Sequence, residues 1–157
     1  MGDMRKSVRE ASGLKAAREI ASRCTGVRLR MLGRVVSGLY DDALRPHGLR
    51  VGQLNILVFV TLKENASPKE IARDLCMEKS TLSRNLERME SRGWIARHEA
   101  EKGRGLTVVP TAAGLRVLGK VLPAWRSAQE SVRDLLGEKG VTEVDRLARR
   151  VGRLEDR

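Results

Sequence analysis

At 157 residues, the chain is long enough for one domain with a real core, or for a small domain plus an assembly element. Its 31 Lys and Arg residues exceed its 20 Asp and Glu residues, and the net charge of +11 favours an acidic polymer as the partner, with a membrane surface as the competing one. No run of apolar residues approaches the ~18 needed to span a bilayer, and the N-terminus has no apolar signal core, so we expect a cytoplasmic protein without a membrane span.

The N-terminal part of the chain combines a basic segment with a long helix. For the basic extension, residues 1–21, three roles stay open: disorder, extension of a dimer helix, or added phosphate contacts. Residues 23–45 predict one helix, ended by Pro46 and Gly48. Its apolar residues form two stripes, which implies burial on two sides. The stripes are Leu32, Val35 and Leu39, and Leu29, Val36, Tyr40 and Ala43.

The segment after it predicts a helix-turn-helix. Residues 51–62 form the first helix of this domain, and a second helix starts at Ser67, which can cap it, with Pro68 in the first turn and Glu70 able to reach back to the cap. A turn that includes Cys76, which we expect in the core, then leads into a third helix.

That third helix is the candidate DNA-reading helix. Leu82, Leu86 and Met89 recur on one side at helical spacing, so the other side projects outward. Hydroxyls and cations there provide donors for phosphates and guanine edges, although a solvated amphipathic helix is the alternative. The candidate DNA-binding residues on this helix are Lys79, Ser80, Thr81, Ser83, Arg84 and Arg88.

A basic hairpin is predicted next. Gly93 ends the helix, and residues 94–98 and 106–109 are typical of two strands joined by a glycine-rich turn. Lys102 and Arg104 on its tip can reach a narrow minor groove, whose negative potential attracts cations. An ordinary exposed hairpin is the alternative.

Beyond the hairpin, Thr111 can cap a long helix that Pro123 should bend or divide in two. Gly137 and Gly140 predict a break, and Thr142 starts a last helix with an apolar seam of Val144, Leu147, Val151 and Leu154. The economical arrangement packs both terminal helices against a second copy, which gives a two-fold dimer; a monomer that buries them on itself is the alternative.

The predicted fold is therefore mainly α with a small β-hairpin wing (α+β): a winged helix-turn-helix flanked by N- and C-terminal dimerisation helices. We expect four segments. They are a basic extension at residues 1–21, a dimerisation helix at 22–47, the DNA-binding domain at 48–110 and the C-terminal dimerisation helices at 111–157.

Nothing in the sequence argues for catalysis, a metal or a cofactor. It has no glycine-rich phosphate loop, nucleophile elbow or clustered carboxylate pair, and Cys24 and Cys76 lack metal-ligand spacing. His47 and His98 are assigned no role.

These elements together resemble the MarR family of bacterial winged-helix regulators, from Cys24 to Leu154. The resemblance is carried by Leu39-Tyr40-Asp41-Asp42-Ala43-Leu44-Arg45-Pro46-His47-Gly48-Leu49 before Gln53, by Ile71-Ala72-Arg73-Asp74-Leu75, by Ser80-Thr81-Leu82-Ser83-Arg84-Asn85-Leu86, and by Arg92-Gly93-Trp94-Ile95. It implies a homodimer on a pseudo-palindromic double-stranded operator and repression relieved by a small, often aromatic ligand or by oxidation.

Site residues also follow from the resemblance. Ser80, Thr81 and Arg84 fall where the family reads the major groove, and Arg104 falls where a wing arginine enters the minor groove. The wing departs from the family pattern, because the acid that usually braces this arginine is missing from Lys102-Gly103-Arg104; Glu99 or Glu101 would have to substitute.

Cys24 is a possible redox site, since some relatives sense peroxides through a cysteine near the start of the first long helix. Arg23 and Arg28 lie close in sequence and would favour its thiolate. A small buried residue at a dimer contact is the alternative. The predicted function is thus a DNA-binding repressor of nearby genes, with a redox regulator, a nonspecific architectural protein, or an enzyme or interaction module on the same fold as the alternatives.

Overall fold

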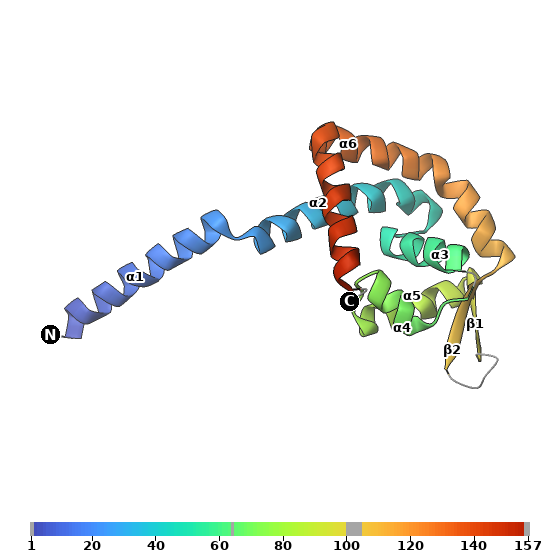
Figure 1. Cartoon of the computed structure of the whole chain (residues 1–157), viewed down its shortest axis with the longest axis horizontal. Helices are drawn as coiled ribbons and strands as arrows, with labels where there is room; N and C mark the ends of the chain where they lie inside the picture. Colours follow the sequence, from blue (N-terminus) through green and yellow to red (C-terminus); the bar gives the residue numbers. More distant parts are fainter. Residues whose placement is uncertain (1, 64, 100–104, 156–157) are drawn as a thin grey trace. The chain divides into compact units, whose positions relative to one another are not determined.

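The computed structural model describes residues 2–63, 65–99 and 105–155, with side chains over 12–63, 65–99 and 105–151. The chain divides into two compact units, Met1–Ser37 and Gly38–Arg157, and each is described by itself. Figure 1 shows the order of the elements along the chain.

The first unit is helical. Helix α1 covers Gly2–Arg23, and helix α2, Thr25–Leu44, begins after the single residue Cys24. The basic extension is therefore helical rather than irregular, and the long helix begins two residues later than expected. All the described side chains of α1 are exposed.

In the second unit, the end of α2 leads through a short 3-10 helix, Arg45–His47, into α3, Val51–Lys63. Gly48 has φ 69°, which lets the chain turn between them. The Asp41 carboxylate accepts a hydrogen bond of 2.7 Å from the Val51 N–H, one of the groups that a helix start leaves without a partner. The expected helix end and the first helix of the DNA-binding domain are both present.

Helix α4, Pro68–Asp74, begins with the predicted capping box. The Glu70 N–H donates to Ser67 Oγ at 3.3 Å, and the Ser67 N–H donates to Glu70 Oε2 at 2.8 Å. This local prediction is confirmed, because its partners are three residues apart and need no tertiary contact.

The placement of Cys76 in the core was wrong, since its side chain is exposed. Cys76 adopts a left-handed conformation with φ 49° at the turn, and its neighbours Leu75 and Met77 pack against the core instead. The chain then enters helix α5, Lys79–Ser91.

The predicted hairpin is confirmed. Strands β1, Ile95–Glu99, and β2, Leu106–Pro110, pair antiparallel, in a register from Ile95 opposite Pro110 to Glu99 opposite Leu106. Gly93 ends α5 with φ 67°, as expected.

The C-terminal helix α6 covers Ala112–Glu155. Thr111 caps it as predicted, accepting from the Gly114 N–H at 3.1 Å, and the helix continues through Pro123. Within its described residues, the non-helical dihedral angles are those of Gly137 (φ 68°, ψ 163°), and there α6 changes direction sharply (Figure 1).

The predicted break at Gly140 and helix start at Thr142 were wrong. The helix resumes directly after Gly137, and Thr142 Oγ1 donates to the Glu138 carbonyl at 2.9 Å, the contact of a residue inside a helix. A glycine breaks a helix where φ becomes positive, whereas Gly140 keeps helical geometry.

The core of the second unit lies where α3, α4, α5, the hairpin and α6 meet. Its fully buried side chains include Leu44, Leu49, Ile56, Leu57, Val60, Ile71, Met89, Ile95, Val108 and Val121. Gly114 marks a close approach, because a Cβ added there would lie 2.1 Å from the Trp94 carbonyl oxygen. The start of α6 is thereby held against the base of the hairpin.

Candidate nucleic-acid interface

Helix α5 packs against the rest of the second unit, called the body from here on, through the apolar side that its sequence predicted. Leu82 and Leu86 are 3% exposed and Met89 is fully buried, and all three belong to the core. Because these residues recur every three or four positions, the opposite side of the helix is directed away from the body.

The predicted DNA-contacting residues of α5 are all exposed: Lys79, Ser80, Thr81, Ser83, Arg84 and Arg88. Ser83 Oγ donates to Glu87 Oε1 at 3.1 Å. Among the residues that the structure describes, the charged groups of Lys79, Arg84 and Arg88 form no ion pair. The exposed side of α5 therefore presents donors that are available to an external acceptor.

A broad groove of about 1280 Å³ lies along α4, α5 and the hairpin. It brings together Lys69 and Arg73 of α4, Lys79 and Ser83 of α5, and Arg97 of β1. Arg73 is paired with Asp74 and Arg97 with Glu90, so Lys69 and Lys79 are the cations of this groove that suit the negative charge of a nucleic-acid backbone.

An ion pair that the sequence analysis missed ties α5 to the hairpin. Arg97 Nε donates to Glu90 Oε2 at 2.9 Å, and a second guanidinium nitrogen donates to the same oxygen. This hydrogen bonding lowers the pKa of Glu90 and raises that of Arg97. An acid at the end of a helix and a base on the following strand, seven residues on, was the signal available in the sequence.

Arg92 holds the end of α5 from the other side. Its guanidinium donates to the Gly48 carbonyl, ahead of α3, and lies 4.9 Å from the centroid of the Trp94 ring. The sequence had shown Arg92 and Trp94 only as part of a motif. In the structure they connect α5 to the loop before α3.

The tip of the wing carries two predicted DNA contacts, Lys102 and Arg104, and both lie outside the described residues. The strands that lead to it are described, and Gly105 at its edge has φ 103°, which suits a tight turn. The contacts of Lys102 and Arg104 stay predictions.

Cys24 is partly buried and lies between α1 and α2. The two arginines expected to act on its thiol make other contacts: Arg23 pairs with Glu19 at 3.6 Å, and Arg28 donates to the Ser22 carbonyl. A redox role for Cys24 stays a prediction, and loss of operator binding in peroxide that Cys24→Ser prevents would support it.

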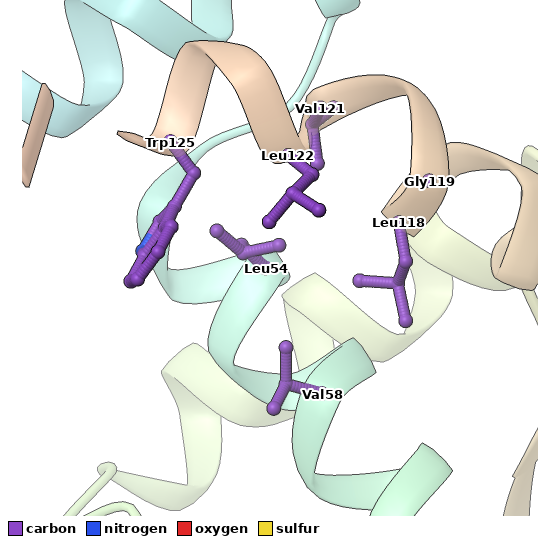
Figure 2. A pocket seen from close by; sticks show the side chains of 7 residues that line it. All are labelled: Leu54, Val58, Leu118, Gly119, Val121, Leu122 and Trp125. Atoms are coloured by element: carbon purple, nitrogen blue, oxygen red, sulfur yellow. The ribbon is translucent and has the colours of Figure 1, made fainter. Parts of the chain in front are cut away.

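A second cavity, an apolar cleft of about 440 Å³, lies between α3 and α6 (Figure 2). Leu54 and Val58 project into it from α3, and Leu118, Val121, Leu122 and Trp125 line it from α6. Its lining is apolar, so it suits an apolar molecule of modest size.

Among the described residues, none of the helices combines the length and the hydrophobicity that a bilayer span requires. The same described residues also contain no group of three or more His, Cys, Asp or Glu side chains that would hold a metal ion.

Comparison with known proteins points in one direction. The model of the MarR family matches residues 47–105. An uncharacterised HTH-type transcriptional regulator of Bacillus subtilis (strain 168), YwoH, is 29% identical over 84 residues, which are 54% of this chain and 61% of that protein. The chain thus spans less than two thirds of this curated relative.

Two solved structures extend the likeness to most of the chain. The transcriptional regulator MosR of M. tuberculosis is 30% identical, with a TM-score of 0.72, and the match covers 85% of this chain and 96% of MosR. A mutant of E. coli MarR complexed with operator DNA is 20% identical, with a TM-score of 0.73 and coverage of 84% and 96%. The latter shows a shared fold.

Proposed function

This chain belongs to the MarR family of transcriptional regulators, and from that premise we propose that it is a dimeric, sequence-specific repressor of nearby genes, relieved by a small apolar ligand. The observation that carries the proposal is the exposed side of α5, where Arg84 and Arg88 form no ion pair among the described residues while Leu82, Leu86 and Met89 hold the helix to the body. A rigidly held helix with available donors is what base recognition requires.

In this proposal, Ser80, Thr81 and Arg84 contact the major groove. Lys79, Ser83 and Arg88 contact phosphates or add to base contacts, and Lys102 and Arg104 of the wing tip enter the minor groove. The E. coli MarR mutant was solved with operator DNA, and the shared fold supports the same docking for α5 here. Phosphate contacts position such a helix, and base-edge contacts give it sequence preference.

Dimerisation is supported by large apolar side chains that one copy of the chain leaves exposed. On α2, Leu29 is 59% exposed and Val35 is 52% exposed. On α6, Leu135, Val144, Leu147 and Val151 are between 41% and 52% exposed. A second copy would bury these residues, as a two-fold interface does.

Relief by a ligand is supported by the apolar cleft between α3 and α6. Its volume of about 440 Å³ suits a small aromatic molecule. Leu54 lies on α3, the first helix of the winged domain, and Trp125 lies on α6, which we assign to dimerisation. A ligand bound between α3 and α6 would change the orientation of the winged domain relative to the dimerisation helices.

The central test is binding of the purified protein to the DNA upstream of its own gene, compared with scrambled DNA of equal length, over a range of salt. Dimer-stoichiometric binding that prefers the native sequence and weakens steeply with salt is expected, because phosphate contacts release counterions. Equal binding to both duplexes would contradict sequence-specific regulation of adjacent genes and favour an architectural protein.

Arg84 variants test base recognition within that assay. Arg84→Ala should weaken operator binding by about 1–3 kcal/mol and reduce sequence preference, if Arg84 contacts a base edge. Arg84→Lys keeps the charge but loses the planar fork, so it should also reduce preference. Arg149→Ala, which removes an exposed cation paired with Asp145 on α6, is the control. Equal weakening on all sequences would assign Arg84 to phosphate.

The cleft is tested with fluorescence, since Trp125 lines it. A small aromatic probe such as naphthalene should change Trp125 emission and weaken operator binding over the same concentrations. Trp125→Phe should remove the optical signal while the operator response persists. A Leu118→Arg variant, which places charge in the cleft, should abolish the change in emission and the effect of the probe on operator binding. If the probe still released the operator from this variant at the same concentration, the cleft would not be the ligand site.

A further inference from the structure

More than half of the chain's net charge lies in its first unit. Residues 1–37 contain nine Lys or Arg and three Asp or Glu, a net of +6, whereas the whole chain carries +11. The winged helix-turn-helix is in the second unit. A strong positive charge outside the DNA-binding domain therefore needs an explanation of its own.

The cations of this unit whose side chains the structure describes are exposed. Over residues 12–37 the sequence has one acid, Glu19, and six basic residues: Lys15, Arg18, Arg23, Arg28, Arg30 and Arg34. Arg23 pairs with Glu19, and Arg28 donates to the Ser22 carbonyl. Within the described residues, the charged groups of the other four form no ion pair. We call residues 12–37 the basic arm.

Over its described side chains, residues 12–23, helix α1 has no apolar seam for another helix. Its large apolar side chains among the described residues are Leu14 and Ile20, which are 54% and 63% exposed. Six residues of an α-helix turn through about 600°, so these two side chains point about 120° apart and form no stripe. Charge, rather than an apolar face, is the recognisable property of α1.

We propose that the basic arm binds the phosphate backbone of the DNA that flanks the operator. The inference rests on the proposed function only for the identity of that duplex. The arm begins in the second half of helix α1, which has 22 residues and a length of about 33 Å, close to one turn of B-DNA. The arm adds affinity and salt dependence without adding sequence preference, because phosphates are the same along the duplex.

A pair of charge variants tests the arm. Lys15→Gln/Arg18→Gln removes two exposed cations from α1. Arg146→Gln/Arg149→Gln removes two from α6, where each pairs with an acid, Glu143 or Asp145. Both variants lose the same charge from exposed helical positions, so a difference in their DNA binding shows that the position of the charge, on α1 or on α6, matters. Circular dichroism and sedimentation establish that helix content and assembly match the wild type.

The measurement is the dependence of the binding constant on salt, for an operator duplex with flanks of about one helical turn and for the same operator without them. On flanked DNA, the Lys15/Arg18 variant should lower the slope by about 1.8 per protomer, so that doubling the salt costs it about 3.5-fold less affinity per protomer than the wild type. The control variant should keep the wild-type slope, and the duplex without flanks should not distinguish the proteins.

The outcomes separate the arm from the operator-binding proposal. An unchanged slope for Lys15→Gln/Arg18→Gln overturns the inference. This holds also if the variant changes dimer dissociation, and also if it loses binding to vesicles of phosphatidylserine. If the wild type shows no preference for its upstream DNA, the repressor proposal fails, and the same slopes measured on mixed-sequence DNA still decide the role of the arm.

Discussion

The body of the winged domain and the terminal helices use the same kinds of side chain in opposite ways. Met89 of α5 is fully buried, whereas Met31 of α2 is 63% exposed, and Leu57 of α3 is fully buried, whereas Leu147 of α6 is 41% exposed. The apolar residues of the body find their neighbours within one chain. Several on the terminal helices, Met31 and Leu147 among them, do not, and such exposed apolar side chains are typical of an interaction surface.

The cations differ in the same manner. Arg97 is bound by Glu90, and Arg92 lies over Trp94 and donates to Gly48, so these two arginines hold the body together. The charged groups of Arg84 and Lys15 have no ion-pair partner in the described part of the chain. Arg92 and Arg97 are therefore structural, whereas Arg84 of α5 and Lys15 of the basic arm are available to a ligand.

The largest effect should come from Gly114→Ala, which damages the body directly. The added Cβ would lie 2.1 Å from the Trp94 carbonyl oxygen and 3.1 Å from Leu57 Cδ1, so the backbone at the start of α6 has to move. We expect a loss of about 3 kcal/mol in the free energy of unfolding, at the upper end of overpacking effects. Denaturant unfolding measures it. Gly119→Ala, where an added Cβ meets nothing within 4 Å, is the control and should not destabilise.

A second variant should disturb assembly and spare the body. Leu147→Ala keeps helix propensity but removes an apolar side chain from the proposed dimer seam. Dimer dissociation, followed by sedimentation equilibrium, should become easier by about 1 kcal/mol for each copy of Leu147, because part of this side chain is already buried within one chain. Unfolding of the winged domain should be unchanged. A dissociation constant equal to that of the wild type would place Leu147 outside the interface.

A smaller loss is expected from Ser67→Ala, which removes the cap of α4. Because the Glu70 N–H then loses its acceptor, unfolding should become easier by about 1 kcal/mol. Ser67→Asp, another good cap, should restore most of it. If Ser67→Ala and Ser67→Asp unfold at the same denaturant concentration, the cap contributes nothing measurable.

The smallest effect concerns acid. Hydrogen bonds from Ser67 lower the pKa of Glu70 below its ordinary value of 4.5. A carboxylate with a lowered pKa in the folded state stabilises the fold above the unfolded pKa, and this contribution is lost as the pH falls through the folded pKa. The unfolding midpoint of Glu70→Gln should therefore depend less on pH below about 4.5 than that of the wild type. Parallel pH profiles of the two proteins would contradict this role of Glu70.

The sequence predicted those features whose causes are local. The capping box at Ser67, the helix end at Gly93 and the buried side of α5 follow from spacings of three and four residues or from one backbone angle. The exposed side of α5 follows as well, since it is the complement of the buried side. The sequence also predicted that two strands pair around a glycine-rich turn.

The features that escaped prediction depend on distant neighbours. Gly114 is constrained by the Trp94 carbonyl, and the side chain of Cys76 is turned out because Leu75 and Met77 occupy the inward positions. Gly137 and Gly140 look alike in sequence, yet Gly137 takes a positive φ and Gly140 does not. A tertiary contact, unlike a cap, leaves little trace in a short stretch of residues.

The junction between α5 and α6 has a mechanical consequence. The Thr111 N–H donates to the Trp94 carbonyl at 3.0 Å, and its hydroxyl donates to the Gly93 carbonyl, so the first turn of α6 is clamped to the end of α5. Because Gly114 packs closely against the same carbonyl, the start of α6 has little room to move relative to Trp94. We therefore expect a rotation at the start of α6 to move residues 93–94, and with them the end of α5.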